Sequence, residues 1–231
     1  MKFEIQPIGY VQSDYKEKFA TPRQSGLVQS ALGKICLTGP FNNPKIVEGL
    51  EGCSHIWLEF IFHQCIDQGW KPRVRPPRLG GNERMGVFAT RATHRPNALG
   101  LSAVKLESIS VQDEDVVLAV SGLDLVDGTP IIDIKPYIPY SDCIPEAQYD
   151  FAQQAPAKTN VFFDIQQKET LSDTDKSFIE DVIAYDPRPA FHKIDPTRTY
   201  GAKLRNFNVV WRYQVSPEET VEIVVTQVSR L

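Results

Sequence analysis

Short segments in which apolar and polar residues alternate fill the first 134 residues of the chain. Alternation with a two-residue period is typical of strands that bury one face. Turn residues separate these segments, and no long helical pattern lies between them, which predicts an antiparallel barrel or sandwich. The expected strands are residues 3–11, 33–37, 55–63, 85–89, 104–109, 116–120 and 130–134. The segment 55–63 is apolar on both faces except at Glu59, which favours a central buried strand.

The pattern changes after Ala155-Pro156-Ala157, which we interpret as a linker. Beyond it we expect a strand, a helix that begins at Ser172 and a hairpin, at residues 161–166, 172–185, and 209–215 with 221–228. The fold class predicted is therefore mainly β, with a β-rich domain at residues 1–152 and a small α+β domain at residues 158–231.

Composition excludes several classes of protein. The longest apolar runs fall well short of the roughly 18–20 residues that a spanning helix requires. The first ten residues alternate and contain Glu4, which predicts a strand rather than a signal peptide. Cys36, Cys53, Cys65 and Cys143 form no C-x-x-C pair. We therefore expect reduced cysteines in a cytoplasmic protein, with no metal and no membrane contact.

Basic residues are concentrated between Trp70 and Pro96. Seven of the chain's 25 lysines and arginines lie at positions 71–95 with one acid, Glu83, so this stretch carries +6 and the rest of the chain carries −10 of the net −4. A solvated loop paired with acids elsewhere is one interpretation. Prolines and glycines give the loop a fixed shape, however, which favours a site for a phosphate backbone. The candidate RNA-binding residues are Arg73, Arg75, Arg78 and Arg95 here, and Arg188 and Arg198 in a second basic cluster.

A polar cluster follows in residues 122–140. Asp124 and Asp127 flank a turn, where carboxylates can accept hydrogen bonds from hydroxyls or an amine. Asp133, Lys135 and Tyr137 share one face of an expected strand. Spacing alone leaves two alternatives equal for these three, a surface salt-bridge ladder or the lining of a site. Neither G-x-G-x-x-G after a strand nor G-x-x-x-x-G-K-[ST] occurs, so a Rossmann site and a P-loop are unsupported.

Two long stretches, PRLGGNERMGVFATRATHRPNALGLS and LDLVDGTPIIDIKPYIPYSD, occur together with YKEKFATPRQ, DPRPAFH and NVVWRY. In these motifs the chain resembles the TsaA-like family and, within it, the TrmO family of tRNA (N6-threonylcarbamoyladenosine) methyltransferases. The resemblance extends over almost the whole chain. One departure is Ala98, where the family usually has the last proline of RPNP, and we expect it to change loop stiffness only.

The resemblance implies a single β-barrel in the N-terminal domain that binds S-adenosylmethionine without a Rossmann fold. It also implies a homodimer that methylates N6 of threonylcarbamoyladenosine next to the tRNA anticodon, with a C-terminal domain that helps to hold tRNA. Carried over by motif, the expected cofactor contacts are Pro22, Arg23, Gln24, His63, Gln64, Arg91, Leu101, Asp124, Leu125, Val126 and Asp127.

The reaction that the resemblance implies needs more than cofactor binding. N6 of adenine is a poor nucleophile, so we expect a proton acceptor or a polarising hydrogen bond from the catalytic candidates Asp133, Lys135 and Tyr137. A lysine serves as an acceptor only if its pKa is lowered. The barrel has its own expected core, so a chain ending near Gln154 is expected to fold and bind the methyl donor.

Two other functions fit the residues alone. One is a non-catalytic RNA-binding barrel that uses the arginines of the basic stretch, and this function requires no cofactor affinity. The other is a small-molecule enzyme on the same barrel, which requires no salt-dependent binding of tRNA.

Overall fold

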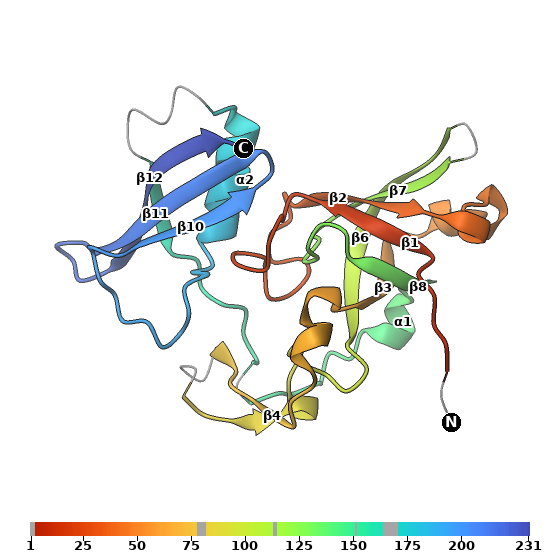
Figure 1. The fold of residues 1–231 in the computed structure, drawn as a ribbon, viewed down its shortest axis with the longest axis horizontal. Coiled ribbons are helices and arrows are strands. Elements are labelled where there is room, and N and C mark those ends of the chain that lie inside the picture. The colour runs from red at the N-terminus through yellow and green to blue at the C-terminus, as the bar shows by residue number, and fades with distance from the viewer. Residues whose placement is uncertain (1–2, 78–81, 113–114, 151, 164–170) are drawn as a thin grey trace.

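The structure is a computed structural model that describes residues 3–77, 82–112, 115–150, 152–163 and 171–231. Six strands form a closed barrel in the order β1-β2-β7-β6-β3-β8, and every neighbouring pair is antiparallel. The barrel strands are β1 (Gly9–Ser13), β2 (Leu32–Leu37), β3 (His55–Ile61), β6 (Leu99–Gln112), β7 (Asp115–Ser121) and β8 (Pro130–Pro136). The mainly β fold is confirmed, and of the two alternatives the barrel is the one formed (Figure 1).

The barrel wall has one buried and one outer face. In β3 the side chains of Ile56, Leu58 and Phe60 are buried in the barrel core. Trp57 and Glu59, between them, are only half-buried. The expectation that this strand is buried on both faces is therefore wrong, because strands of a small closed barrel alternate between interior and exterior. Gly100 of β6 lies against the ring of Phe60, where a Cβ atom would overlap the ring.

Some expected strands are shorter or shifted. β1 begins at Gly9 rather than residue 3, and Phe3 and Ile5 before it are exposed. Of residues 85–89, only Met85–Gly86 form a strand, β5, which pairs with β4 (Arg73–Val74). The remainder is a 3-10 turn. Further 3-10 turns occupy Gly39–Phe41, Pro44–Val47, Leu50–Gly52 and His63–Gln68, and the short helix α1 covers Pro139–Asp142.

The C-terminal part forms a four-stranded sheet in the order β10-β11-β12-β9 with one helix. Its elements are β9 (Asn160–Phe163), α2 (Asp173–Ile183), β10 (Thr199–Leu204), β11 (Phe207–Val215) and β12 (Val221–Arg230). The expected helix and hairpin are confirmed, and Ser172 caps α2 by accepting a hydrogen bond from the Asp175 backbone N–H at 3.1 Å. Residues 164–166 of the expected first strand lie outside the described residues. No helix in the described part of the chain is long and apolar enough to cross a membrane.

The connection between β1 and β2, residues 14–31, reaches from the barrel to the C-terminal sheet; we call it the crossover segment. Tyr15 and Val28 are buried in the same core as Phe178 and Trp211 of the C-terminal part. Tyr15 also forms an isolated β-bridge with Leu204 at the end of β10. Figure 1 shows this segment, in red, between the two sheets. The crossover segment is therefore flanked by barrel strands but packs into the second core.

Candidate active site

Four connecting segments meet at one end of the barrel, and two of them belong to the single connection between β3 and β6. β1, β3 and β7 end there and β2, β6 and β8 begin there, because neighbouring strands are antiparallel. The connections are the crossover segment and residues 62–68, 90–98 and 122–129. They carry every expected cofactor residue except Leu101, which lies on the outer wall of β6 opposite Glu59.

The crossover segment contacts each of the other three connections. Its Gln24 Oε1 accepts a hydrogen bond from Arg91 Nη1 at 2.6 Å. Its Lys18 donates to the backbone carbonyl of Gln64. The backbone N–H of Gly26 donates to the carbonyl of Gly122 at 2.8 Å, and a Cβ at Gly122 would lie 3.3 Å from the Gly26 Cα. The structure thus brings together Gln24, Gln64 and Arg91, three of the residues expected to contact S-adenosylmethionine.

The remaining residues of this end differ in exposure. Pro22 and His63 are half-buried and Arg23 is exposed. Burial lowers the pKa of His63 below its ordinary value, and Lys18 nearby acts in the same direction. His63 is therefore neutral at physiological pH and offers one donor and one acceptor nitrogen.

Asp124 has a buried carboxylate oxygen without a partner. Its Oδ1 is one of two buried side-chain atoms in the described residues that make no hydrogen bond, and the other is Tyr15 Oη. Burial raises the pKa of Asp124 to about 6, and a hydrogen bond from Ser102 offsets this only in part. A buried acceptor without a donor is costly unless a ligand supplies one. The residues therefore fit a ligand that presents a hydroxyl, an ammonium or another cationic group.

Both carboxylate oxygens of Asp127 have partners within the protein. Oδ1 accepts from the Ser13 N–H at 2.8 Å, and Oδ2 lies 3.0 Å from Lys16 Nζ. Leu125 is buried in the barrel core, and its carbonyl accepts from the Ser13 hydroxyl. The Val126 carbonyl accepts from the Thr129 hydroxyl at 2.6 Å. These three residues shape the turn and tie it to the crossover segment, whereas Asp124 keeps an acceptor for a ligand.

Asp133 and Lys135 form the surface salt-bridge ladder that spacing had left as one of two alternatives. Lys135 Nζ lies 2.6 Å from Glu59 Oε1 and also pairs with Asp133. Hydrogen bonds to Asp133 and then to Glu59 raise the pKa of Lys135 above its ordinary value. The condition for Lys135 to act as a proton acceptor, a lowered pKa, is therefore not met in this arrangement.

Tyr137 lies far from the cofactor end of its own chain. Its N–H donates to the carbonyl of His55 at 3.0 Å, at the start of β3, whereas His63 follows the end of that strand. The six steps along β3 from His55 to Ile61, at about 3.3 Å each, separate the two levels by roughly 20 Å. Asp133 pairs with Glu59, between these levels. Lys135 and Tyr137 therefore lie away from the expected cofactor residues at the end of the barrel, whereas Asp133 lies nearer that end, across Glu59 from Leu101.

Comparison with known proteins identifies the fold and the motifs. Residues 10–143 match the family model for the tRNA-methyltransferase O N-terminal domain, and residues 148–230 match that for the TrmO C-terminal domain. The chain belongs to the TrmO family. It is 49% identical over 218 residues to the tRNA (adenine(37)-N6)-methyltransferase of Escherichia coli, covering 91% of this chain and 93% of that protein.

Two further proteins are similar to this one along most of its chain. A protein of Pseudomonas aeruginosa named as a putative S-adenosylmethionine-dependent methyltransferase, RcsF, is 44% identical, with 92% of this chain and 94% of that protein covered. A crystal structure of TrmO from Pseudomonas aeruginosa superposes with a TM-score of 0.79 at 38% identity, covering 99% of each chain. The family and the barrel fold expected from the motifs are therefore confirmed.

The departure from the family's RPNP changes the backbone as well as the stiffness of the loop. Ala98 has φ of 51° and its N–H donates to the Arg95 carbonyl at 3.0 Å. A proline has no N–H and fixes φ near −65°, so it cannot adopt this conformation. The expectation of a change in stiffness alone is wrong.

We expect Ala98→Gly to stabilise the protein by about 1 kcal/mol, because glycine has no steric penalty at positive φ. Ala98→Pro should destabilise it, since the turn loses its hydrogen bond and its backbone conformation. Thermal unfolding of the two variants beside the parent protein measures both effects. An Ala98→Pro variant that unfolds at the parent's temperature would contradict this account of the loop.

The expected RNA-binding arginines fall into two groups. Arg73, Arg75 and Arg198 are exposed. Arg95 donates to the carbonyls of Val87 and Thr90 and so holds a turn. Arg188 pairs with Asp186 at 2.9 Å and lies over the ring of Tyr213. Arg78 lies outside the described residues. RNA contact by the exposed group stays a prediction, whereas the side chains of Arg95 and Arg188 are held by contacts within the chain.

We expect Arg73→Ala combined with Arg75→Ala to weaken tRNA binding and to flatten its salt dependence. Each lost phosphate contact should remove roughly one unit from the slope of log K against log salt. Lys34→Ala with Lys45→Ala removes the same charge from exposed positions outside the basic stretch and serves as the control. Binding isotherms at several salt concentrations measure the slopes, and equal slopes for the two double variants would exclude this role.

Proposed function

We propose that this protein transfers a methyl group from S-adenosylmethionine to N6 of threonylcarbamoyladenosine at tRNA position 37. The observation that carries the proposal is the 49% identity, across nearly the whole chain, to a tRNA (adenine(37)-N6)-methyltransferase. The unpartnered Asp124 Oδ1 among the four connections supports a donor site at that end of the barrel. A tRNA substrate and four free cysteines support a cytoplasmic location.

The donor site is formed by the crossover segment and the turn at residues 122–129. Gln24, Gln64 and Arg91 hold the polar groups of the donor, and Asp124 accepts from one of its hydroxyl or amine groups. The donor supplies a methyl group on a sulfonium, whose positive charge a carboxylate stabilises. The protein must place N6 in line with that methyl group, and positioning of this kind lowers a barrier by roughly 7–11 kcal/mol.

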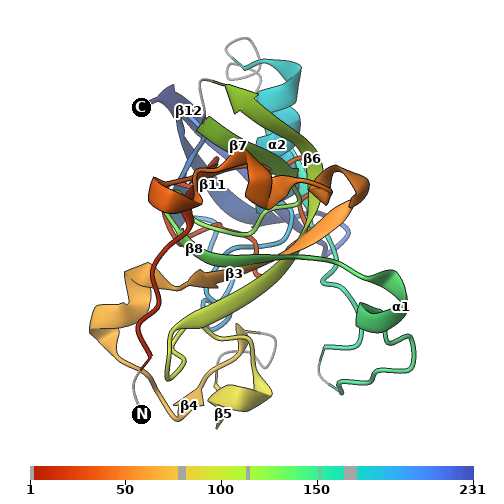
Figure 2. The ribbon, with the colours of Figure 1, turned by 90° about the vertical axis from the view of Figure 1, so that its right-hand side faces the viewer.

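The outer wall formed by β3, β6 and β8 supports a homodimer. It carries the exposed Leu99 and Leu101 and the half-buried Trp57 and Ile61. Figure 2 views the barrel from the side away from the C-terminal sheet, with β6 and β8 crossing the front. Leu101 is a cofactor contact by resemblance but lies on this wall. A second copy packed on this wall accounts for the position of Leu101, because S-adenosylmethionine bound to the partner subunit would then reach Leu101.

The same dimer gives the catalytic candidates a role. Lys135 and Tyr137 lie on this wall away from the cofactor end of their own chain, and together with Asp133 they would face the donor site of the partner subunit. Tyr137 and Asp133 are then the candidates for polarising N6 or accepting its proton. Lys135, held protonated by two carboxylates, stabilises negative charge instead.

The test is mass spectrometry of tRNA nucleosides after incubation with the protein and S-adenosylmethionine. We expect methylated threonylcarbamoyladenosine, and none from tRNA that lacks the threonylcarbamoyl group. Calorimetry with the methyl donor alone separates the alternatives. An RNA-binding barrel without catalysis would show no donor binding, and a small-molecule enzyme would bind the donor without salt-dependent tRNA affinity.

A further inference from the structure

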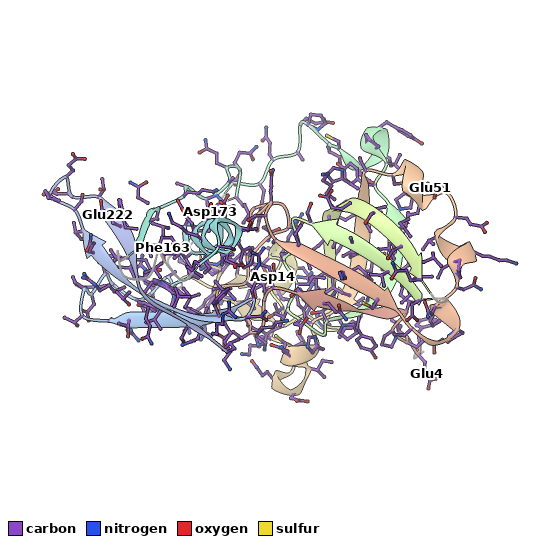
Figure 3. The ribbon with its side chains drawn as sticks, turned by 90° about the horizontal axis from the view of Figure 1, so that it is seen from above. Glu4, Asp14, Glu51, Phe163, Asp173 and Glu222 are labelled. Carbon is purple, nitrogen blue, oxygen red and sulfur yellow. The ribbon has the colours of Figure 1, made fainter. Side chains whose placement is uncertain are left out.

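An ion-pair cluster joins the crossover segment to the C-terminal domain. Arg205 Nε lies 2.9 Å from Asp14 Oδ2, and its Nη1 lies 2.8 Å from Asp175 Oδ1 at the start of α2. The guanidinium also stacks on the ring of Phe178, 4.3 Å from its centroid. Figure 3 shows Asp14 at the junction between α2 and the barrel strands. One side chain thus connects the first residue of the crossover segment to the helix and to the second core.

The backbone of Arg205 indicates that its side chain is needed. Arg205 has φ of 52° in the turn between β10 and β11, a conformation that glycine and asparagine adopt most readily. An arginine there strains the backbone, and strain of this kind persists where surrounding contacts offset it. Here the two carboxylates and the aromatic ring provide those contacts.

Further contacts fix the crossover segment on both sides of Pro22–Gln24. The ring of Phe19 stacks on Trp211 at 5.8 Å and on Tyr200 at 6.4 Å. Ser30, beyond the triplet, donates to Asp181 Oδ2 of α2 at 2.9 Å. The C-terminal domain therefore holds the segment before and after the residues that contact Arg91 and the turn of Asp124.

We infer that Arg205 and Phe19 are positioning residues of the methyl-donor site, through which the C-terminal domain sets donor affinity. This inference rests on the donor site proposed above. It replaces the expectation that a chain ending near Gln154 keeps donor binding, because such a chain lacks the partners of Asp14, Phe19 and Ser30. The coupling is reciprocal, so a tRNA that orders the C-terminal domain also strengthens donor binding.

Arg205→Asn is the decisive variant. Asparagine suits the turn, so a purely structural role of Arg205 in the hairpin predicts unchanged or greater stability and unchanged donor affinity. A positioning role predicts a donor Kd raised at least about tenfold in calorimetry without RNA. Phe19→Ala should give the same loss, and Phe19→Tyr, which keeps the stacked ring, should restore the affinity.

The control is Phe163→Leu, on β9 at the opposite edge of the same sheet from β10. It removes packing from the same core without touching the stacked ring of Phe19, and its donor Kd should stay within about twofold of the parent's. All titrations are made well below the unfolding temperature of each variant. An equal loss of affinity in Phe163→Leu would overturn the inference, because general destabilisation would then explain the data.

Gln24→Ala separates failure of the inference from failure of the proposed site. If it weakens donor binding while Arg205→Asn and Phe19→Ala bind normally, the site stands and the positioning role is excluded. If Gln24→Ala also binds the donor normally, the proposed donor site is wrong and the inference falls with it.

Discussion

Replacing Asp124 with asparagine is expected to stabilise the ligand-free protein and to weaken donor binding at the same time. The folded protein raises the pKa of Asp124 from its ordinary value of 3.8 to about 6. Above pH 6 the folded state therefore carries a buried charge that the unfolded chain exposes to water. One pKa unit corresponds to about 1.4 kcal/mol, so removing the charge should raise the free energy of unfolding by up to roughly 3 kcal/mol.

The pH dependence of the free energy of unfolding tests a second time whether Asp124→Asn stabilises the protein. Because the folded pKa is raised, the destabilisation by Asp124 is fully present above about pH 6 and disappears as the pH falls toward 3.8. The gain in Asp124→Asn should therefore shrink between about pH 7.5 and pH 5 in chemical denaturation. Donor affinity of the parent should fall over the same range, since the charged form is the better acceptor.

Asp127→Asn is the matched control for Asp124→Asn. The carboxylate of Asp127 already has Ser13 and Lys16 as partners, so its loss should destabilise the protein. Asp124→Asn should weaken donor binding about ten- to a hundredfold, the effect of losing a charge-assisted hydrogen bond of about 1.5–3 kcal/mol. Unchanged donor affinity in calorimetry would remove Asp124 from the site.

The second large effect should appear when two inactive variants are mixed. Asp124→Asn removes a donor contact, and Tyr137→Phe removes a hydroxyl that we place in the partner's site. Random pairing in a two-fold dimer makes about half of the dimers mixed, and one of the two sites in each mixed dimer has both residues intact. The mixture, assayed at low donor concentration, should therefore recover about one quarter of the parent activity.

A site built within one chain predicts a different outcome. The mixture would then show only the mean activity of the two variants, and the dimeric site would be wrong.

Leu101→Arg gives an independent check, because it places a charge on the exposed outer wall beside Glu59 and its ion pairs. We expect a folded monomer in light scattering with little methyl transfer, while a dimer of normal activity would exclude this interface.

The periodic spacing of apolar residues, alternating in strands and helical in α2, predicted the elements whose buried faces are large and regular. β2 and β7 and the helix α2 follow such patterns, and the serine cap of α2 marks its start. β10 was missed because its buried side chains include the small Ala202 and a glycine interrupts the segment. The strand therefore depends on pairing with β11 and packing on the crossover segment, which no local pattern records.

In the candidate site too, local motifs identified some residues, whereas contacts between residues distant in sequence could not be predicted. Motifs identified Gln24, Arg91 and Asp124, and the structure places them at one end of the barrel. No motif in the sequence singled out Arg205. Its role as a link depends on Asp14, which lies 191 residues away in sequence, and such a pairing leaves no signal in the neighbourhood of either residue.

The long sequence separation between Asp14 and Arg205 also bears on how the protein is made. A ribosome adds about 5–20 residues per second, so roughly 10 to 40 s pass between the synthesis of these two residues, 191 positions apart. During that interval the six barrel strands can emerge and pair, while the crossover segment still lacks the completed C-terminal sheet against which it packs. With the positioning role inferred above, the nascent chain completes its proposed donor site only when its last strands have been translated.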